Sequence, residues 1–144
     1  MIEHPPSVAL VVTDGNEVVL VRQHRPGASG LVLEVPAGKL EPGETVAAAA
    51  DRELAEECGL AAAGWVELGS FWAAPGYSTE RVTVLAGAVS GTAEAAHDED
   101  EEIEVVRVPM EEALARVEDA GSIAALALWV RNYRGWNSTR RTSG

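Results

Sequence analysis

The sequence predicts an α/β (α+β) domain, because segments with the character of strands and of helices follow one another along one chain. Short runs rich in β-branched and apolar residues, bounded by turn residues, lie on both sides of an alanine-rich helical segment at 45–58. Two more segments with helical spacing follow at 110–120 and 122–134. With 144 residues, 47% of them hydrophobic, the chain is long enough for one domain with a substantial core.

The first strands form a predicted hairpin. Apolar, β-branched runs at 8–13 and 18–21 are separated by the turn residues at 14–16. The run at 31–38 is a further strand, and Pro36 ends it because proline cannot donate to a strand ladder.

The second half of the chain continues in the same way. Strands are expected at 65–73 and 81–89, joined by a turn-rich loop at 74–80, and another at 103–108. Gly121 separates the two helices expected near the C-terminal end.

Composition limits the function. The net charge of −12 argues against binding polymeric nucleic acid, which requires lysine and arginine to displace counterions. Cys58 is the one cysteine, so no internal disulfide forms. The N-terminus lacks the layout of a signal peptide, and no apolar run approaches the length of a membrane span, so we expect a cytoplasmic protein without membrane association. We expect the domain to cover 1–134, with a flexible tail at 135–144.

The helix at 45–58 carries the most informative residues. Thr45 suits its N-cap and Gly59 its C-terminal cap. Its carboxylates Glu53, Glu56 and Glu57 share one face, where like charges repel. Such a cluster is ordinarily a solvated acidic face, but it also suits a hard cation such as Mg²⁺ or Mn²⁺. The face expected to pack on the core consists of Ala47, Ala50, Leu54 and Cys58.

The spacing of the surrounding residues favours the cation site. The residues concerned are Gly38, Glu44, Arg52-Glu53-Leu54, Glu56-Glu57 and Gly59-Leu60. They match the Nudix box without a departure, so the chain resembles the Nudix hydrolases, which cleave a nucleoside diphosphate linked to another group. The resemblance implies an α/β/α sandwich with a mixed β-sheet.

The same resemblance implies roles for the box residues. Glu53 and Glu57 correspond to direct ligands of Mg²⁺, with Mn²⁺ as an alternative. Glu56 corresponds to a ligand or a water-holding partner, and the carbonyl of Ala37 to a further ligand. Arg52 of the helix and Glu44 of the catalytic loop correspond to an internal ion pair that fixes the loop against the helix.

Three segments outside the box resemble the enzymes of this family that hydrolyse ADP-ribose. In the run 22–26, Arg25 corresponds to a phosphate ligand, whereas His24 is expected to be a surface side chain. In the run 34–38, Glu34 is either a carboxylate beside the metal or a structural one. In the loop 74–80, Glu80 corresponds to a residue holding the nucleoside end; the alternative is a surface carboxylate paired with the next residue, Arg81.

The acidic segment 97–104 precedes the last expected strand. A run of acids is ordinarily a solvated loop. By the resemblance, Glu99 is a candidate general base and Glu101 a late metal ligand, and which of them takes the proton stays open.

These correspondences imply an enzyme that hydrolyses a small nucleoside diphosphate derivative, with ADP-ribose or a related nucleotide sugar as the substrate. ADP-ribose would yield AMP and ribose 5-phosphate. The alternatives are a pyrophosphohydrolase of (oxidised) nucleoside triphosphates and a Nudix-fold sensor without catalysis. A protein-interaction domain has only the acidic loop in its favour. The ADP-ribose enzymes usually carry an N-terminal β region that builds their dimer, whereas this sequence begins shortly before its first expected strand, so the expectation of a homodimer stays open.

Overall fold

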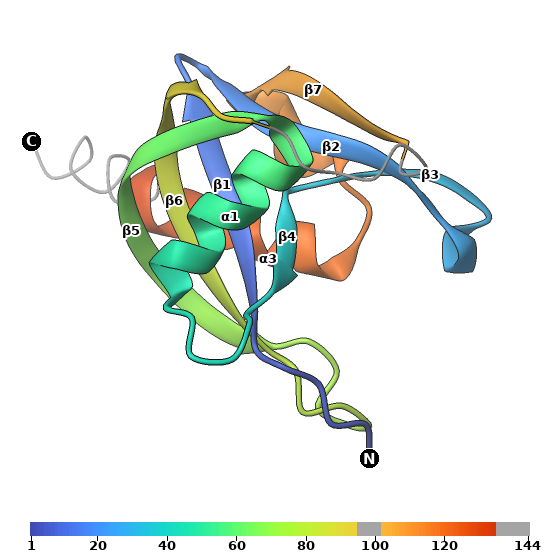
Figure 1. Ribbon diagram of the computed structural model, residues 1–144. Helices are drawn as coiled ribbons and strands as arrows, with labels where there is room; N and C mark the ends of the chain where they lie inside the picture. Colours follow the sequence, from blue (N-terminus) through green and yellow to red (C-terminus); the bar gives the residue numbers. More distant parts are fainter. Residues whose placement is uncertain (95–101, 135–144) are drawn as a thin grey trace, which may run out of the picture.

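The computed structural model describes residues 1–94 and 102–134. In this part of the chain, a seven-stranded mixed sheet lies between helices on its two faces (Figure 1). The strands are β1 (Ser7–Asp14), β2 (Glu17–Arg25), β3 (Gly30–Glu34), β4 (Ala37–Lys39), β5 (Leu60–Trp72), β6 (Arg81–Thr92) and β7 (Ile103–Pro109). The helices are α1 (Val46–Cys58), α2 (Met110–Arg116) and α3 (Ala120–Trp129), with short helical turns at Pro26–Ala28 and Val130–Arg134. The α/β/α sandwich is confirmed.

Strand β1 is the centre of the sheet. The main path runs β3-β2-β1-β6-β5, with β4 paired to β1 and β7 paired to β2. The β1–β6 pair is parallel and the other pairs are antiparallel. The predicted β1–β2 hairpin is present, and Gly15 takes the positive φ (64°) that its tight turn requires.

The strand expected at 31–38 is divided in two, which corrects the prediction. Strand β3 pairs with β2 and ends at Glu34, whereas β4 pairs with β1. Pro36 lies in the break, and its carbonyl accepts a hydrogen bond from the Leu10 N–H at 2.9 Å. The break transfers the chain from one strand to another and places the following loop beside the centre of the sheet.

Helix α1 begins and ends as its sequence predicts. Thr45 Oγ1 accepts a hydrogen bond from the Ala48 N–H at 3.1 Å, and Gly59 closes the helix with φ 67°. Its buried side chains are Ala49, Ala50 and Leu54. The prediction that Ala47 faces the core was wrong: it lies in the exposed first turn, one residue after the helix begins. Cys58 is half-buried, and burial raises the pKa of its thiol to about 12.

The C-terminal helices differ from the prediction in their boundary. Helix α2 ends at Arg116, and buried Val117 is extended instead of helical. Asp119 then caps α3, because its side chain accepts a hydrogen bond from the Ser122 N–H at 3.0 Å. Gly121 therefore lies in the first turn of α3 and does not separate the helices.

Each face of the sheet has its own apolar cluster. Helix α1 packs on one face through Ala49, Ala50 and Leu54, and α2 and α3 cover the other through Ala113, Ala125 and Leu126. Strand β5 begins before the predicted 65–73, at Leu60, and ends at Trp72, whereas β6 continues past the predicted 81–89 to Thr92. Three register irregularities lie between the two strands. Among the described helices, none has the length and apolar composition needed to cross a bilayer.

Candidate active site

A cavity of about 710 Å³ opens between α1, the start of α3 and the strands around β1. Its walls include groups from the box helix, from the ends of β2 and β3, and from the β5–β6 connection. The predicted site residues that line it are Arg25, Ala37, Glu53, Glu56, Glu57 and Glu80. Residues more than 50 positions apart in the chain thus line one cavity.

The ion pair predicted between Arg52 and Glu44 is present. The Arg52 Nε lies 2.8 Å from Glu44 Oε2, and Nη2 lies 2.9 Å from Oε1. The same Nη2 donates to the carbonyl of Lys39 at 2.8 Å, so helix and loop are joined at two points. Hydrogen bonding to Arg52 lowers the pKa of Glu44 to about 2, and the Glu44 carboxylate raises the pKa of Arg52.

Glu53 lies directly against the loop backbone at Gly38. A Cβ atom at position 38 would overlap the Glu53 carboxyl group, so with any other residue there this carboxyl would have to turn away. Burial raises the pKa of Glu53, although Arg52 Nη1 donates to its Oε1 at 2.8 Å.

Glu57 is the least compensated carboxylate of the cluster. Its Oε2 is buried and has no hydrogen-bond partner among the described residues. Burial, and then the charge of Glu53, raises the pKa of Glu57 to about 8, while a hydrogen bond from the backbone of Ala37 opposes the shift. An unpartnered buried carboxylate oxygen is costly, and a divalent cation would satisfy it.

Arg52 also determines how the other acids point. Its Nη1 lies 2.8 Å from Glu53 Oε1 and 3.3 Å from Glu56 Oε2, so both carboxylates lean towards one guanidinium. Accordingly, no group of three His, Cys, Asp or Glu side chains is already gathered for a metal ion within 1–94 and 102–134. These oxygen donors nevertheless fit a hard cation, because the negative charge of the carboxylates exceeds the single positive charge of Arg52.

Arg25 is held at the cavity by Glu34. The Nε–Oε2 distance is 2.7 Å and the Nη2–Oε1 distance is 3.0 Å, which makes the pair bidentate. The hydrogen bond to Glu34, followed by its charge, raises the pKa of Arg25. Glu34 is buried, at 8% exposure, whereas 48% of the Arg25 side chain is exposed. Of the two interpretations of Glu34, this geometry favours the structural one.

Glu80 faces the cavity rather than its sequence neighbour. Its Oε2 accepts a hydrogen bond from Ser7 Oγ at 2.7 Å. Arg81 instead donates to Ser70 Oγ at 2.8 Å and lies over the Trp72 ring, 4.6 Å from its centroid. The alternative of a surface pair between Glu80 and Arg81 is therefore wrong.

Several groups in the cavity wall were not predicted. His4 and Ser7 lie near Glu80, and Asp119 and Ser122 lie at the start of α3. Asp119 could have been recognised as an N-cap before an apolar helical run. Buried Ser122 accepts a hydrogen bond from the Val35 N–H at 2.9 Å, a contact between distant segments that no local pattern announces.

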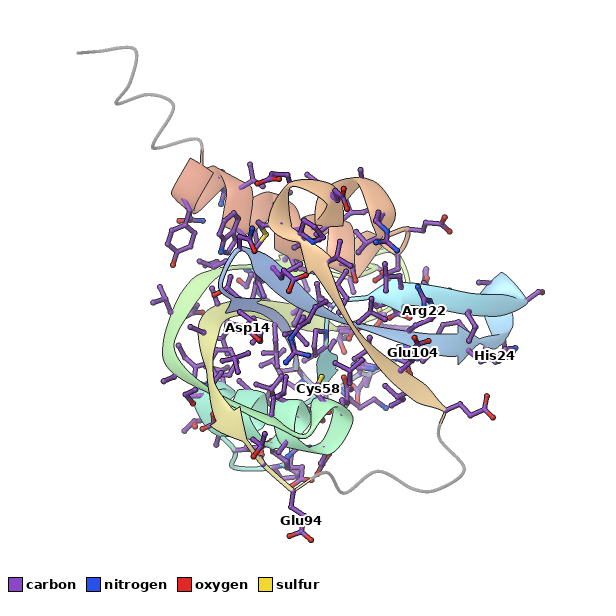
Figure 2. All side chains as sticks on the ribbon, turned by 90° about the horizontal axis from the view of Figure 1, so that it is seen from above. Asp14, Arg22, His24, Cys58, Glu94 and Glu104 are labelled. Carbon is purple, nitrogen blue, oxygen red and sulfur yellow. The ribbon has the colours of Figure 1, made fainter. Side chains whose placement is uncertain are left out.

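Three further residues named in the sequence analysis are Glu99, Glu101 and His24. Glu99 and Glu101 lie outside the described residues. His24 is exposed, as expected, towards the outer end of the β2–β3 ribbon (Figure 2).

Comparison with known proteins agrees with this geometry. Residues 3–129 match the family model described as the NUDIX domain. The chain is 41% identical over 121 residues to the ADP-ribose pyrophosphatase of Bacillus subtilis, covering 82% of this chain and 65% of that protein. It is 34% identical over 122 residues to the methanol dehydrogenase activator of Bacillus methanolicus, covering 83% and 66%. The chain thus spans just under two thirds of the length of these relatives.

A solved structure is similar throughout the fold. The crystal structure of an ADP compounds hydrolase superposes with a TM-score of 0.79 and 27% sequence identity, covering 88% of this chain and 73% of that one. The family model and the relatives agree with the sheet order and with the box helix and its paired loop. The chain belongs to the Nudix family.

Proposed function

We propose that this protein hydrolyses the pyrophosphate of a nucleoside diphosphate linked to a sugar, in a reaction that depends on Mg²⁺ or Mn²⁺. ADP-ribose is the preferred candidate, with AMP and ribose 5-phosphate as products. The observation that carries the proposal is the buried Glu57 Oε2, which has no hydrogen-bond partner among the described residues and lies beside Glu53 in a cavity that Arg25 also lines. The names of the similar proteins, an ADP-ribose pyrophosphatase and an ADP compounds hydrolase, support this substrate class.

The residues divide into three tasks. Glu53, Glu57, Glu56 and the carbonyl of Ala37 would hold the cation. When bound, the cation supplies charge neutralisation at the phosphate oxygens and acidifies coordinated water. The Arg52–Glu44 pair keeps the loop of Ala37 against the helix, so that the donors stay in register.

Arg25 binds a phosphate oxygen in this proposal. Glu34 occupies two of its N–H groups, which fixes the plane of the guanidinium at the cavity that Arg25 lines. A phosphate held at two points presents its phosphorus atom to water in one orientation. Glu99 is proposed as the base that removes the proton from this water, and Glu101 as a further ligand.

The test is turnover with a panel of ADP-ribose, ADP-glucose, diadenosine polyphosphates and 8-oxo-dGTP, each with Mg²⁺, with Mn²⁺ and with EDTA. Release of AMP from ADP-ribose, abolished by EDTA, is the expected result. A preference for 8-oxo-dGTP would favour the nucleoside triphosphate alternative, and binding without turnover of any compound would favour a sensor. Reaction in H₂¹⁸O then shows which phosphate receives the oxygen of water.

A further inference from the structure

We propose that Ser122, in the first turn of α3, is a positioning residue for the cation site, because it fixes the segment 35–38 that runs past the acids of α1. The inference rests on the proposed function, since that function requires the cation. Helices α1 and α3 pack on opposite faces of the sheet (Figure 1). Ser122 therefore gives the helix on one face a part in a site whose carboxylates Glu53, Glu56 and Glu57 belong to the helix on the other.

The Val35 N–H lies where the chain belongs to no strand. Strand β3 ends at Glu34 and β4 begins at Ala37, and the described registers of both strands leave Val35 without a paired residue. Val35 is 3% exposed, so water does not readily replace a missing acceptor. Ser122 Oγ accepts the hydrogen bond from this N–H at 2.9 Å. Because a buried N–H without an acceptor is costly, this bond limits where the segment can lie.

Ser122 is itself held in place. Its N–H donates to Asp119 Oδ2 at 3.0 Å, and the Ile123 N–H donates to the Asp119 carbonyl at 3.1 Å. The helix that follows is anchored in the apolar cluster by Ala125 and Leu126, which are buried. Ser122 is 1% exposed, so its hydroxyl is a fixed acceptor at the start of a capped and packed helix.

The segment continues from Val35 into β4 without a free residue. The Pro36 carbonyl accepts from the Leu10 N–H at 2.9 Å, and Ala37 is paired with Ala9 of β1. Only one residue separates the bond to Ser122 from the first residue of β4. A displacement of Val35 is therefore passed directly to the backbone of Ala37.

The acids of α1 lie against this same backbone. The Glu53 carboxyl occupies the space that a Cβ atom at Gly38 would take, and the backbone of Ala37 hydrogen-bonds to the Glu57 carboxyl. The contact at Val35 thus fixes one end of the segment from α3, while its other end meets the metal donors. Without Ser122 Oγ, the Ala37 carbonyl and the two carboxylates would no longer be held in one arrangement.

A purely structural role would change stability and nothing at the site, so the experiment compares Ser122→Ala with a variant of similar stability. Ala113→Gly is this control, because Ala113 is buried in α2 on the same face of the sheet as α3. Each variant should lower the midpoint of thermal unfolding by about 3–6 °C. Ser122→Thr keeps the hydroxyl acceptor and tests rescue.

The first measurement is Mn²⁺ affinity by calorimetry, without substrate and at a temperature where circular dichroism shows each protein to be folded. Ser122→Ala should bind Mn²⁺ at least about fivefold more weakly than the parent. Ala113→Gly and Ser122→Thr should stay within about twofold. If Ser122→Ala does not fold, Ser122→Cys replaces it, because sulfur fills the space but accepts a hydrogen bond only weakly.

The second measurement is amide hydrogen exchange in the metal-free protein, followed by NMR. In Ser122→Ala, the amides of Val35 and Ala37 should both exchange at least about tenfold faster than in Ala113→Gly. Faster exchange at Val35 alone is the result of a purely structural role and overturns the proposal. So does Mn²⁺ affinity within about twofold of the parent in Ser122→Ala, an equal loss in Ala113→Gly, or an equal loss in Ser122→Thr.

The proposed function is judged separately. A parent that binds Mn²⁺ but releases no AMP from ADP-ribose rejects the reaction, and the dependence of Mn²⁺ binding on Ser122 still stands. A parent that hydrolyses ADP-ribose, with unchanged Mn²⁺ affinity in Ser122→Ala, rejects the positioning role and keeps the reaction.

Discussion

Arg25 and Glu34 are joined by two hydrogen bonds, of 2.7 and 3.0 Å, although nine positions separate them and a helical turn lies between. The β2–β3 register places Arg25 opposite Gly30 and Glu34 opposite Val21, so the two residues are not direct cross-strand partners, and their long side chains meet along the ribbon. A buried carboxylate thus holds a half-exposed guanidinium at the edge of the cavity. Phosphate binding by Arg25 and the support from Glu34 can be tested apart.

Arg25→Ala should lower kcat/KM for ADP-ribose by roughly 10- to 100-fold, the range expected for one charged hydrogen bond. Arg25→Lys should recover little, because a single ammonium group cannot make the same planar contacts. Glu34→Gln should lower kcat/KM less, by about three- to tenfold, since the arginine is kept but is less well oriented. Arg22→Lys is the control: Arg22 pairs with Glu104 on an exposed part of the sheet (Figure 2), and its rate should stay within about twofold of the parent.

Gly38→Ala should abolish most of the activity while the protein stays folded. The added Cβ would overlap the Glu53 carboxyl, so this carboxyl must turn away from position 38 and leaves its place among the metal donors. Activity and Mn²⁺ affinity, measured by calorimetry, should both fall by at least about tenfold. Gly91→Ala, where the added atom meets open space, should change neither. Unchanged Mn²⁺ affinity in Gly38→Ala would contradict the placement of the site.

The metal-free protein should lose stability as the pH rises from about 4.5 to about 8. The pKa of Glu57 is about 8 in the folded protein and has its ordinary value of 4.5 when unfolded. The protonated carboxyl is therefore favoured by folding, and this contribution is complete below pH 4.5 and lost as the pH passes 8. Urea unfolding across this range should show the trend, and Glu57→Gln should flatten it.

Bound Mn²⁺ should oppose the loss of stability that the metal-free protein shows as the pH rises. Since the cation binds the ionised carboxylate, its affinity should increase with pH up to about 8, with proton release that calorimetry in buffers of different ionisation enthalpy detects. In Glu57→Gln, proton release should decrease, with the part from Glu53 remaining, and turnover should fall by more than tenfold. Rates within about threefold of the parent would remove Glu57 from the ligand set.

The Arg52–Glu44 pair should stabilise the protein above the unfolded pKa of Glu44, near 4.5, and lose its effect as the pH falls towards about 2. Glu44→Gln should therefore show a smaller loss of stability between pH 4.5 and 2 than the parent. Thermal unfolding followed by circular dichroism over this range measures the difference. An identical acid profile for both proteins would show that the pair does not influence folding. The exposed Glu111→Gln variant serves as the control.

Local signals in the sequence determined much of this protein. Thr45 and Gly59 are caps whose contacts lie within one turn of α1, and the turn at Gly15 joins neighbouring strands, so residue type alone predicts them. The spacing of Gly38, Glu44 and the acids of α1 likewise carries the box, because a helix of known period places Glu53 and Glu57 on one face.

Tertiary structure decided what depends on the pairing of distant segments. At Pro36 the pairing partner of the chain changes: β3 before it pairs with β2, and β4 after it pairs with β1. This break follows from the sheet order and not from the apolar run in which Pro36 lies. The Arg25–Glu34 pair, the turning of Glu80 towards Ser7, and the placing of His4 by Thr79 each require two elements to meet. Sequence spacing reports contacts within one turn or one strand, whereas the partner of a buried charge is chosen by which chains lie side by side in the folded protein.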